Sequence, residues 1–103
     1  MTAEQVDAVE RYRKAVEAYA ETKAMEAKLE DLRPVAKQKA ILRILGTDNP
    51  LTGKLHSGSS AEAIVETDKE YAEYRALQRE ALMQSILMKG HMIAAQFAME
   101  VSR

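Results

Sequence analysis

One stretch interrupts a chain that otherwise has helical periodicity. Residues 46–60, with the sequence GTDNPLTGKLHSGSS, contain three of the four glycines and one of the two prolines. Asp-Asn-Pro and Thr-Gly are turn-forming combinations. On both sides of this stretch, apolar residues recur every three or four positions, as they do on one face of a helix. The sequence therefore predicts an all-α fold, a long antiparallel helical hairpin that forms a single domain over residues 1–103.

The first helix is predicted over about residues 3–45. Thr2 stands three residues before Gln5, the spacing of a capping box, and Gly46 suits a left-handed C-terminal cap. Pro34 lacks a backbone N–H, which leaves two alternatives: the helix is kinked and continues, or it is broken and a new helix begins there. The residues expected to face the second helix are Val6, Val9, Tyr12, Val16, Tyr19, Thr22, Met25, Leu29, Leu32, Ala36 and Ala40.

A loop over residues 46–59 is expected to connect this helix to a second one over about residues 60–101. Capping-box spacings at Ser59 with Glu62 and at Thr67 with Glu70 leave two alternatives. The helix is continuous from near Ser60, or a short turn precedes a main helix that begins near residue 68. One apolar stripe of this helix is expected to face the first helix, and it consists of Tyr71, Tyr74, Leu77, Ala81, Met88 and Ala95.

A second apolar stripe on the same helix has no place in a two-helix hairpin. It consists of Leu82, Ile86, Ile93 and Phe97. A helix that is apolar around much of its circumference is buried on several sides, and a hairpin buries only one. These four residues are therefore predicted to form the interface of a homo-oligomer, a coiled-coil-like helical bundle.

The charge is unevenly distributed along the chain. The formal net charge is -1, yet residues 33–56 carry five basic side chains against Asp48 alone, a net charge of +4. A positive bend suggests a partner. The residues predicted to contact a partner or a phosphate are Lys37, Lys39, Arg43, Lys54 and His56. The partner is either an unidentified protein or, as the alternative, a nucleic acid bound by the basic segment 33–54.

No sequence pattern dictates a reaction, and a small enzyme that uses His56 in the polar loop is the third and least favoured hypothesis. Thr52-Gly53-Lys54 does not fit a phosphate-binding loop, because the glycine required five residues earlier is replaced by Asp48 and because Lys54 is followed by leucine. Neither histidine belongs to the Glu-x-x-His motif of helical metal sites, and the chain has no cysteine. We therefore expect no catalytic residues, no metal and no cofactor.

The N-terminal sequence is charged and lacks the apolar segment of a signal peptide. No apolar run approaches the ~20 residues of a membrane span. We therefore expect a cytoplasmic protein that does not contact a membrane.

Residues 48–74, about a quarter of the chain, contain Asn49-Pro50, Thr52-Gly53-Lys54, His56-Ser57, Ser60-Ala61-Glu62 and Tyr71. This turn-then-helix pattern resembles small helical proteins encoded by bacteriophages and prophages, a group with no assigned activity. The resemblance implies a phage-encoded protein in the cytoplasm of a bacterial host. With the patterns above, it leads to the expectation of a non-enzymatic interaction or adaptor protein. Such a protein would self-associate and present its polar loop and basic bend to a partner.

Overall fold

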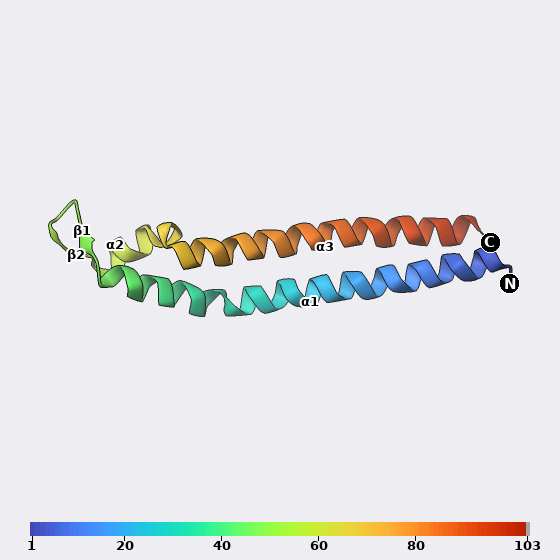
Figure 1. Ribbon diagram of the computed structural model, residues 1–103, viewed down its shortest axis with the longest axis horizontal. Coiled ribbons are helices and arrows are strands. Elements are labelled where there is room, and N and C mark those ends of the chain that lie inside the picture. The colour runs from blue at the N-terminus through green and yellow to red at the C-terminus, as the bar shows by residue number, and fades with distance from the viewer. Residues whose placement is uncertain (103) are drawn as a thin grey trace. The chain divides into compact units, whose positions relative to one another are not determined.

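Two long helices dominate the computed structural model, which describes residues 1–102 (Figure 1). Helix α1 spans Ala3–Leu45 and helix α3 spans Lys69–Val101. Between them lie the two-residue strands β1 and β2, the short helix α2 and the 3-10 helix η1, at Asp48–Asn49, Lys54–Leu55, Gly58–Ala63 and Val65–Thr67. The long helices pair as an antiparallel hairpin, which confirms the all-α prediction.

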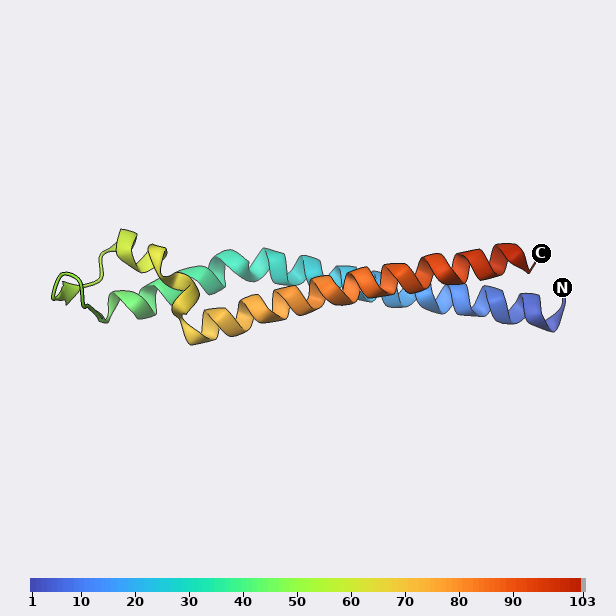
Figure 2. The same ribbon diagram turned by 90° about the horizontal axis from the view of Figure 1, so that it is seen from above.

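The contacts within the chain form two compact units, and each unit contains a part of both long helices. The terminal unit consists of Met1–Lys28 and of α3 from Arg79 onward. The loop unit consists of Leu29–Gln78. Within each unit the α1 and α3 segments lie side by side and run in opposite directions (Figure 2).

The ends of α1 are set by short side chains. The predicted capping box is confirmed: the Thr2 N–H donates to Gln5 Oε1 at 2.8 Å and the Gln5 N–H donates to Thr2 Oγ1 at 3.2 Å. The helix continues through Pro34, the first of the two alternatives. The left-handed cap expected at Gly46 is wrong, because Gly53 is the glycine with positive φ. Thr47 closes the helix instead, since its N–H and hydroxyl both donate to the Ile44 carbonyl.

The return segment, residues 56–70, leads from the loop into α3. It follows the second of the two alternatives for this region, because the short helices α2 and η1 precede the main helix. Both predicted capping boxes are wrong. Helix α2 is capped by Ser57, whose Oγ accepts the Ser60 N–H at 3.2 Å. Helix α3 is capped by Asp68, whose Oδ2 accepts the Tyr71 N–H at 2.9 Å. Asp68 has the extended backbone that an N-cap requires, whereas the preceding Thr67 belongs to η1 and donates its hydroxyl to a carbonyl of that turn.

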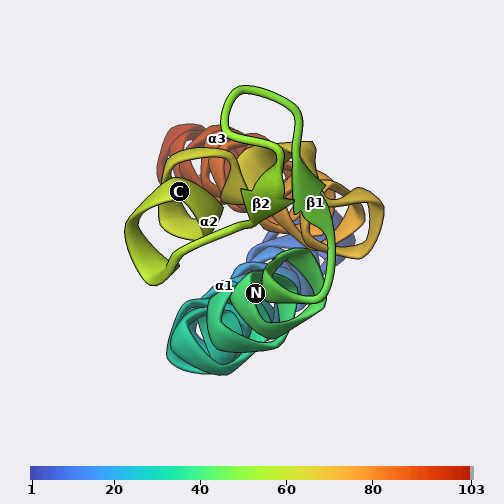
Figure 3. The same ribbon diagram turned by 90° about the vertical axis from the view of Figure 1, so that its left-hand side faces the viewer.

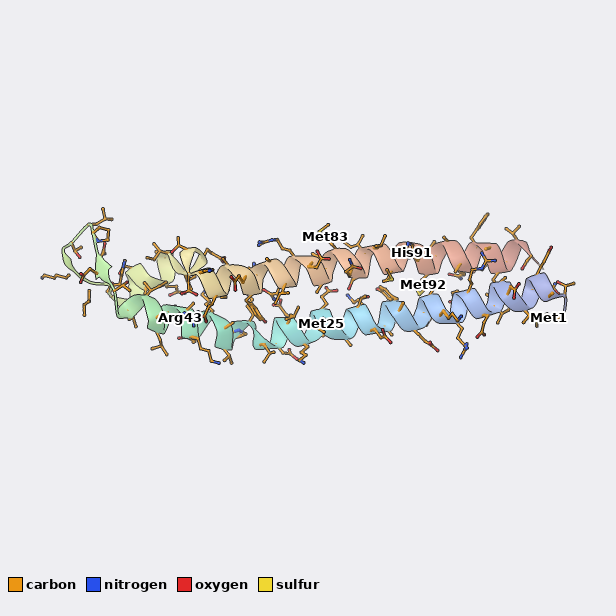
Figure 4. The ribbon with its side chains drawn as sticks, viewed as in Figure 1. Met1, Met25, Arg43, Met83, His91 and Met92 are labelled. Atoms are coloured by element: carbon orange, nitrogen blue, oxygen red, sulfur yellow. The ribbon has the colours of Figure 1, made fainter. Side chains whose placement is uncertain are left out.

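Small side chains fill much of the face between the two helices of the terminal unit. The inward residues follow heptad spacing, the repeat that keeps a seam facing its partner in a coiled coil. On α1 they are Gln5, Ala8, Tyr12, Ala15, Tyr19, Thr22 and Glu26, and on α3 they are Ala81, Ser85, Met88, Met92, Ala95 and Met99. Figure 4 shows Met92 on the side of α3 turned toward α1, and Met83 on the opposite side.

The predicted inner stripe of α1 is therefore partly wrong. Val6, Val9, Val16 and Met25 are 37–51% exposed, while the residue next to each of them occupies the inner position. Alanine has lower hydrophobicity than valine, but its size permits a shorter distance between helix axes. Leu32 in the loop unit is likewise exposed.

The main core of the loop unit lies where the last turns of α1 meet α2, η1 and the start of α3. Its members are Ala40, Ile41, Ile44, Ala61, Val65 and Tyr71. Tyr71 is 1% exposed, and its ring stacks on that of Tyr74 with centroids 6.3 Å apart. The Tyr74 hydroxyl and the Gln78 amide both donate to the Leu29 carbonyl. Leu77, predicted to face inward, is 58% exposed.

Tyr71 is a large buried side chain with an unusual hydroxyl. Among the described residues, this hydroxyl makes no hydrogen bond of ordinary geometry. The neighbouring Arg33 guanidinium is nevertheless close enough for the hydroxyl to raise the pKa of Arg33. The aromatic ring, rather than the hydroxyl, is therefore expected to provide most of the stability at this position.

We expect Tyr71→Ala to reduce the free energy of unfolding by about 3–5 kcal/mol, because it leaves a large cavity in a small core. Tyr71→Phe keeps the ring and removes only a buried hydroxyl that makes no hydrogen bond of ordinary geometry, so its effect should stay within about 1 kcal/mol. Urea unfolding followed by circular dichroism measures both. Equal losses for the two variants would contradict this assignment.

Candidate interaction surfaces

The four residues predicted to form an oligomer interface lie at the surface of the terminal unit. Leu82, Ile86, Ile93 and Phe97 are 48%, 64%, 53% and 68% exposed. They lie on α3 outside the heptad positions that face α1. Sequence reasoning missed three further exposed apolar side chains on the same part of the helix, Met83, Leu87 and Val101.

These residues belong to a second heptad pattern on the side of α3 that points away from α1. Steps of four and three connect Met83, Leu87, Gly90, Ala94, Phe97 and Val101. Ile86 and Ile93 flank this line. We call this set of eight residues the outer seam. The steps match those of the inner face, so α3 carries two seams, one paired with α1 and one unpaired.

The outer seam is almost free of charge. From Ala81 to Met99, Lys89 is the one Lys, Arg, Asp or Glu residue. Single exposed apolar side chains are common on protein surfaces, but contiguous apolar patches mark interaction sites. The outer seam is therefore the leading candidate for a binding surface in the terminal unit.

The predicted basic contact residues do not form one free positive surface. Arg43 donates to both carboxylate oxygens of Asp68 at 3.0 and 2.6 Å, and it also lies 3.1 Å from a carboxylate oxygen of Glu70. The Lys37 ammonium lies 3.4 Å from the Glu62 carboxylate. Acidic side chains of the return segment thus neutralise two of the four predicted cations.

The Arg43–Asp68 pair ties the end of α1 to the start of α3. The hydrogen bonds from Arg43, followed by those from the backbone N–H groups of Tyr71 and Glu70, hold the pKa of Asp68 below its usual value. The same pair raises the pKa of Arg43. Asp68 therefore serves both as a helix cap and as the partner of a bidentate arginine.

The remaining predicted contacts differ in their surroundings. Lys39 and Lys54 are exposed, and within residues 1–102 neither makes an ion pair. His56 is half-buried, and its Nδ1 lies 3.0 Å from Ser60 Oγ. The His56 N–H donates to the Thr47 carbonyl at 3.1 Å. His56 therefore helps to close the loop.

The loop contains a small antiparallel strand pair, with Asp48 opposite Leu55 and Asn49 opposite Lys54. Figure 3 looks onto this hairpin, with α2 beside it. Strands of two residues are too short to give a periodic pattern, and no such signal was present in the sequence.

A tight turn joins the two strands. The Asn49 carbonyl accepts the N–H groups of Thr52 and Gly53 at 3.2 and 2.9 Å, and Asn49 Oδ1 accepts the Leu51 N–H at 3.0 Å. Gly53 has φ of 70°, which favours glycine. The turn leaves Leu51 92% exposed.

A groove of about 290 Å³ lies in the loop unit, with an apolar floor that includes Leu32, Val35 and Tyr74. Lys39, Arg43 and Glu70 are its charged lining residues. No nucleophile and base are held together there by any hydrogen bond in the structure. Across residues 1–102, no three His, Asp or Glu side chains come together in a way that could hold a metal ion.

Within residues 1–102, no helix combines the length and the apolar character that a membrane crossing demands. Comparisons with protein-family models, with curated proteins and with solved structures found no match to this chain.

Two substitutions separate the roles of Asp68. Asparagine retains capping ability but loses the charge that pairs with Arg43, whereas alanine loses both. We expect both variants to be less stable at pH 7 than the parent protein, and Asp68→Ala to be less stable than Asp68→Asn by about 1 kcal/mol. Thermal unfolding at pH 7 measures this difference.

Asp68→Asn also tests how the stability of the protein depends on pH. The pKa of Asp68 is lowered in the folded state, so the stability it contributes is present above its unfolded pKa near 3.8. That stability is lost as the pH falls through the folded-state pKa. Unfolding measured from pH 6 down to pH 2 should show a smaller loss for Asp68→Asn than for the parent. Parallel pH profiles would contradict the pairing.

Proposed function

We propose that the protein is a non-enzymatic helical interaction protein. It self-associates through Leu82 and the outer seam of α3, which includes Ile86, Ile93 and Phe97. It presents the loop 46–59 and the nearby basic residues to a protein partner. The observation that supports this proposal most directly is the run of exposed apolar side chains on a face of α3 that α1 does not cover.

The composition of the inner face supports self-association. Alanine, serine and polar side chains occupy many inward positions of the terminal unit, so the pair of helices buries little apolar area by itself. Burial of apolar surface is the main favourable term in folding and association. A second copy supplies the missing burial without requiring any other molecule.

The order of the loop supports a presenting role. Hydrogen bonds within the Asn49–Gly53 turn and from His56 to Thr47 hold its backbone. Leu51 and Lys54 remain exposed on this frame. An apolar side chain beside a free cation suits a protein surface that has an apolar pocket and acidic neighbours.

Nucleic-acid binding by the basic segment 33–54 is the less favoured alternative. Lys37 and Arg43 would have to exchange protein carboxylates for phosphates. The segment also has no aromatic side chain on which a base could stack. The resemblance to phage-encoded proteins leads us to place the proposed role in the cytoplasm of a bacterial host.

Self-association is tested by molar mass from light scattering over a range of protein concentrations. We expect a dimer or larger oligomer for the parent protein. Ile86→Asp and Ile93→Asp should each weaken association by about 100-fold or more, because each places a charge in an apolar interface. Leu42→Asp is the matched control: Leu42 is 68% exposed, like Ile86 at 64%, but it lies on α1 in the loop unit.

A monomeric parent protein would contradict the proposal. So would an oligomer that persists in both isoleucine variants, since its interface would then lie elsewhere.

A further inference from the structure

Gly90 lies within α3, far from either end of that helix, and on the outer seam. Glycine is among the least favourable residues in a helix interior. A Cβ added to Gly90 would meet nothing within 4 Å. Packing within this chain therefore gives no reason for a glycine at this position, whereas the approach of a second backbone would.

The side chains of the outer seam are arranged almost symmetrically about Gly90. Leu87 and Ile93 lie three residues away on either side, and Met83 and Phe97 lie seven residues away. Four residues away the pattern differs, because Ile86 on one side is large and Ala94 on the other is small. Because of this asymmetry, a second α3 packs differently in the parallel and the antiparallel orientation.

We propose that α3 packs against α3 of a second copy in an antiparallel orientation, and that the two helices cross at Gly90. This inference rests on the proposed self-association and specifies its geometry. A two-fold axis passes through the crossing point, so the same patch serves on both copies. Met83 then faces Phe97 of the second copy, and Leu87 faces Ile93 of the second copy.

Side-chain size favours the antiparallel orientation. A parallel pair in register would place Ile86 against Ile86 and Ala94 against Ala94, which crowds one level of the interface and leaves a gap at another. The antiparallel pair places Ile86 against Ala94 on both sides of the axis. Large against small is the arrangement that fills space without voids.

The exposed apolar area approaches that of a standard dimer interface. Seven apolar side chains of ~150–200 Å² each, about half to two-thirds exposed, present roughly 700 Å² per copy, close to the ~800 Å² per partner of a standard interface. They are Leu82, Met83, Ile86, Leu87, Ile93, Phe97 and Val101.

The lack of charge favours a second copy over a charged partner. Lys89 lies at the edge of the seam, and the seam residues themselves carry no ionisable group. An acidic or basic partner would find no complementary charge there, whereas an identical uncharged face leaves no ion buried and unpaired.

Cysteine crosslinking tests this geometry, because the chain has no cysteine of its own. A disulfide forms only where two Cβ atoms approach within ~3.5–4.5 Å. Under mild oxidation, Gly90→Cys should crosslink to itself, since it lies on the two-fold axis. Met83→Cys alone and Phe97→Cys alone should remain uncrosslinked. A mixture of these two variants should give the mixed disulfide dimer.

Lys14→Cys provides the control, since Lys14 is an exposed residue of α1 in the same unit. Rapid self-crosslinking of Met83→Cys would show a parallel pair and overturn the proposal. A dimer by light scattering in which none of the α3 cysteines crosslinks faster than the control would also overturn it, while the proposed self-association would stand. A monomer would overturn both.

Substitution at Gly90 gives a second measurement. An added side chain meets no atom of its own chain, so Gly90→Leu should leave the helix content unchanged while it separates the two copies. We expect its dimer dissociation constant to rise about 100-fold, and that of Gly90→Ala to rise less. An unchanged dissociation constant in Gly90→Leu would overturn the crossing at this residue.

Discussion

Two helices in contact share only one face, and this limit governs the structure described here. In the terminal unit, helix α3 has apolar side chains on two of its sides, but α1 covers just one of these sides. The covered side is filled largely by alanine, serine and slender methionine side chains, while isoleucine, leucine and phenylalanine remain outside. A hairpin of this kind obtains modest stability from its own contacts, and its largest apolar residues remain available to another molecule.

The loop unit depends on a different kind of interaction. Its core is small, and a buried tyrosine is its largest fully buried side chain. One carboxylate, that of Asp68, accepts the first N–H groups of α3 and also two hydrogen bonds from Arg43 near the end of α1. A helix start and a contact between two elements are therefore fixed by a single side chain. This arrangement explains why Arg43, one of the cations that suggest a binding patch in the sequence, is paired within the chain itself.

The sequence was informative wherever a local rule acts without competition. Turn residues between two periodic segments were enough to predict two antiparallel helices, whereas the oligomer interface predicted from the second stripe on α3 stays a prediction. Predictions failed where a neighbouring residue could take the same role, as at the inner positions of α1 and at the N-caps of α2 and α3. Valine exceeds alanine in hydrophobicity, yet Ala8 and Ala15 occupy inner positions of α1 while Val9 and Val16 beside them are exposed. Ser57 and Asp68 capped their helices in place of neighbouring residues with an equally suitable spacing. The partners of Lys37 and Arg43 lie 25 residues away, a distance over which no local pattern acts.

The turn at the tip of the loop has a consequence for the kinetics of recognition. Its backbone is already fixed by three hydrogen bonds to Asn49 and by the left-handed Gly53. A partner that docked on Leu51, as we propose, would therefore meet a preformed turn, and no segment would have to fold during the encounter. Such an association would proceed as the collision of two preformed bodies, at a rate set by diffusion and orientation. The lifetime of such a complex would then depend on how well the partner encloses one leucine side chain.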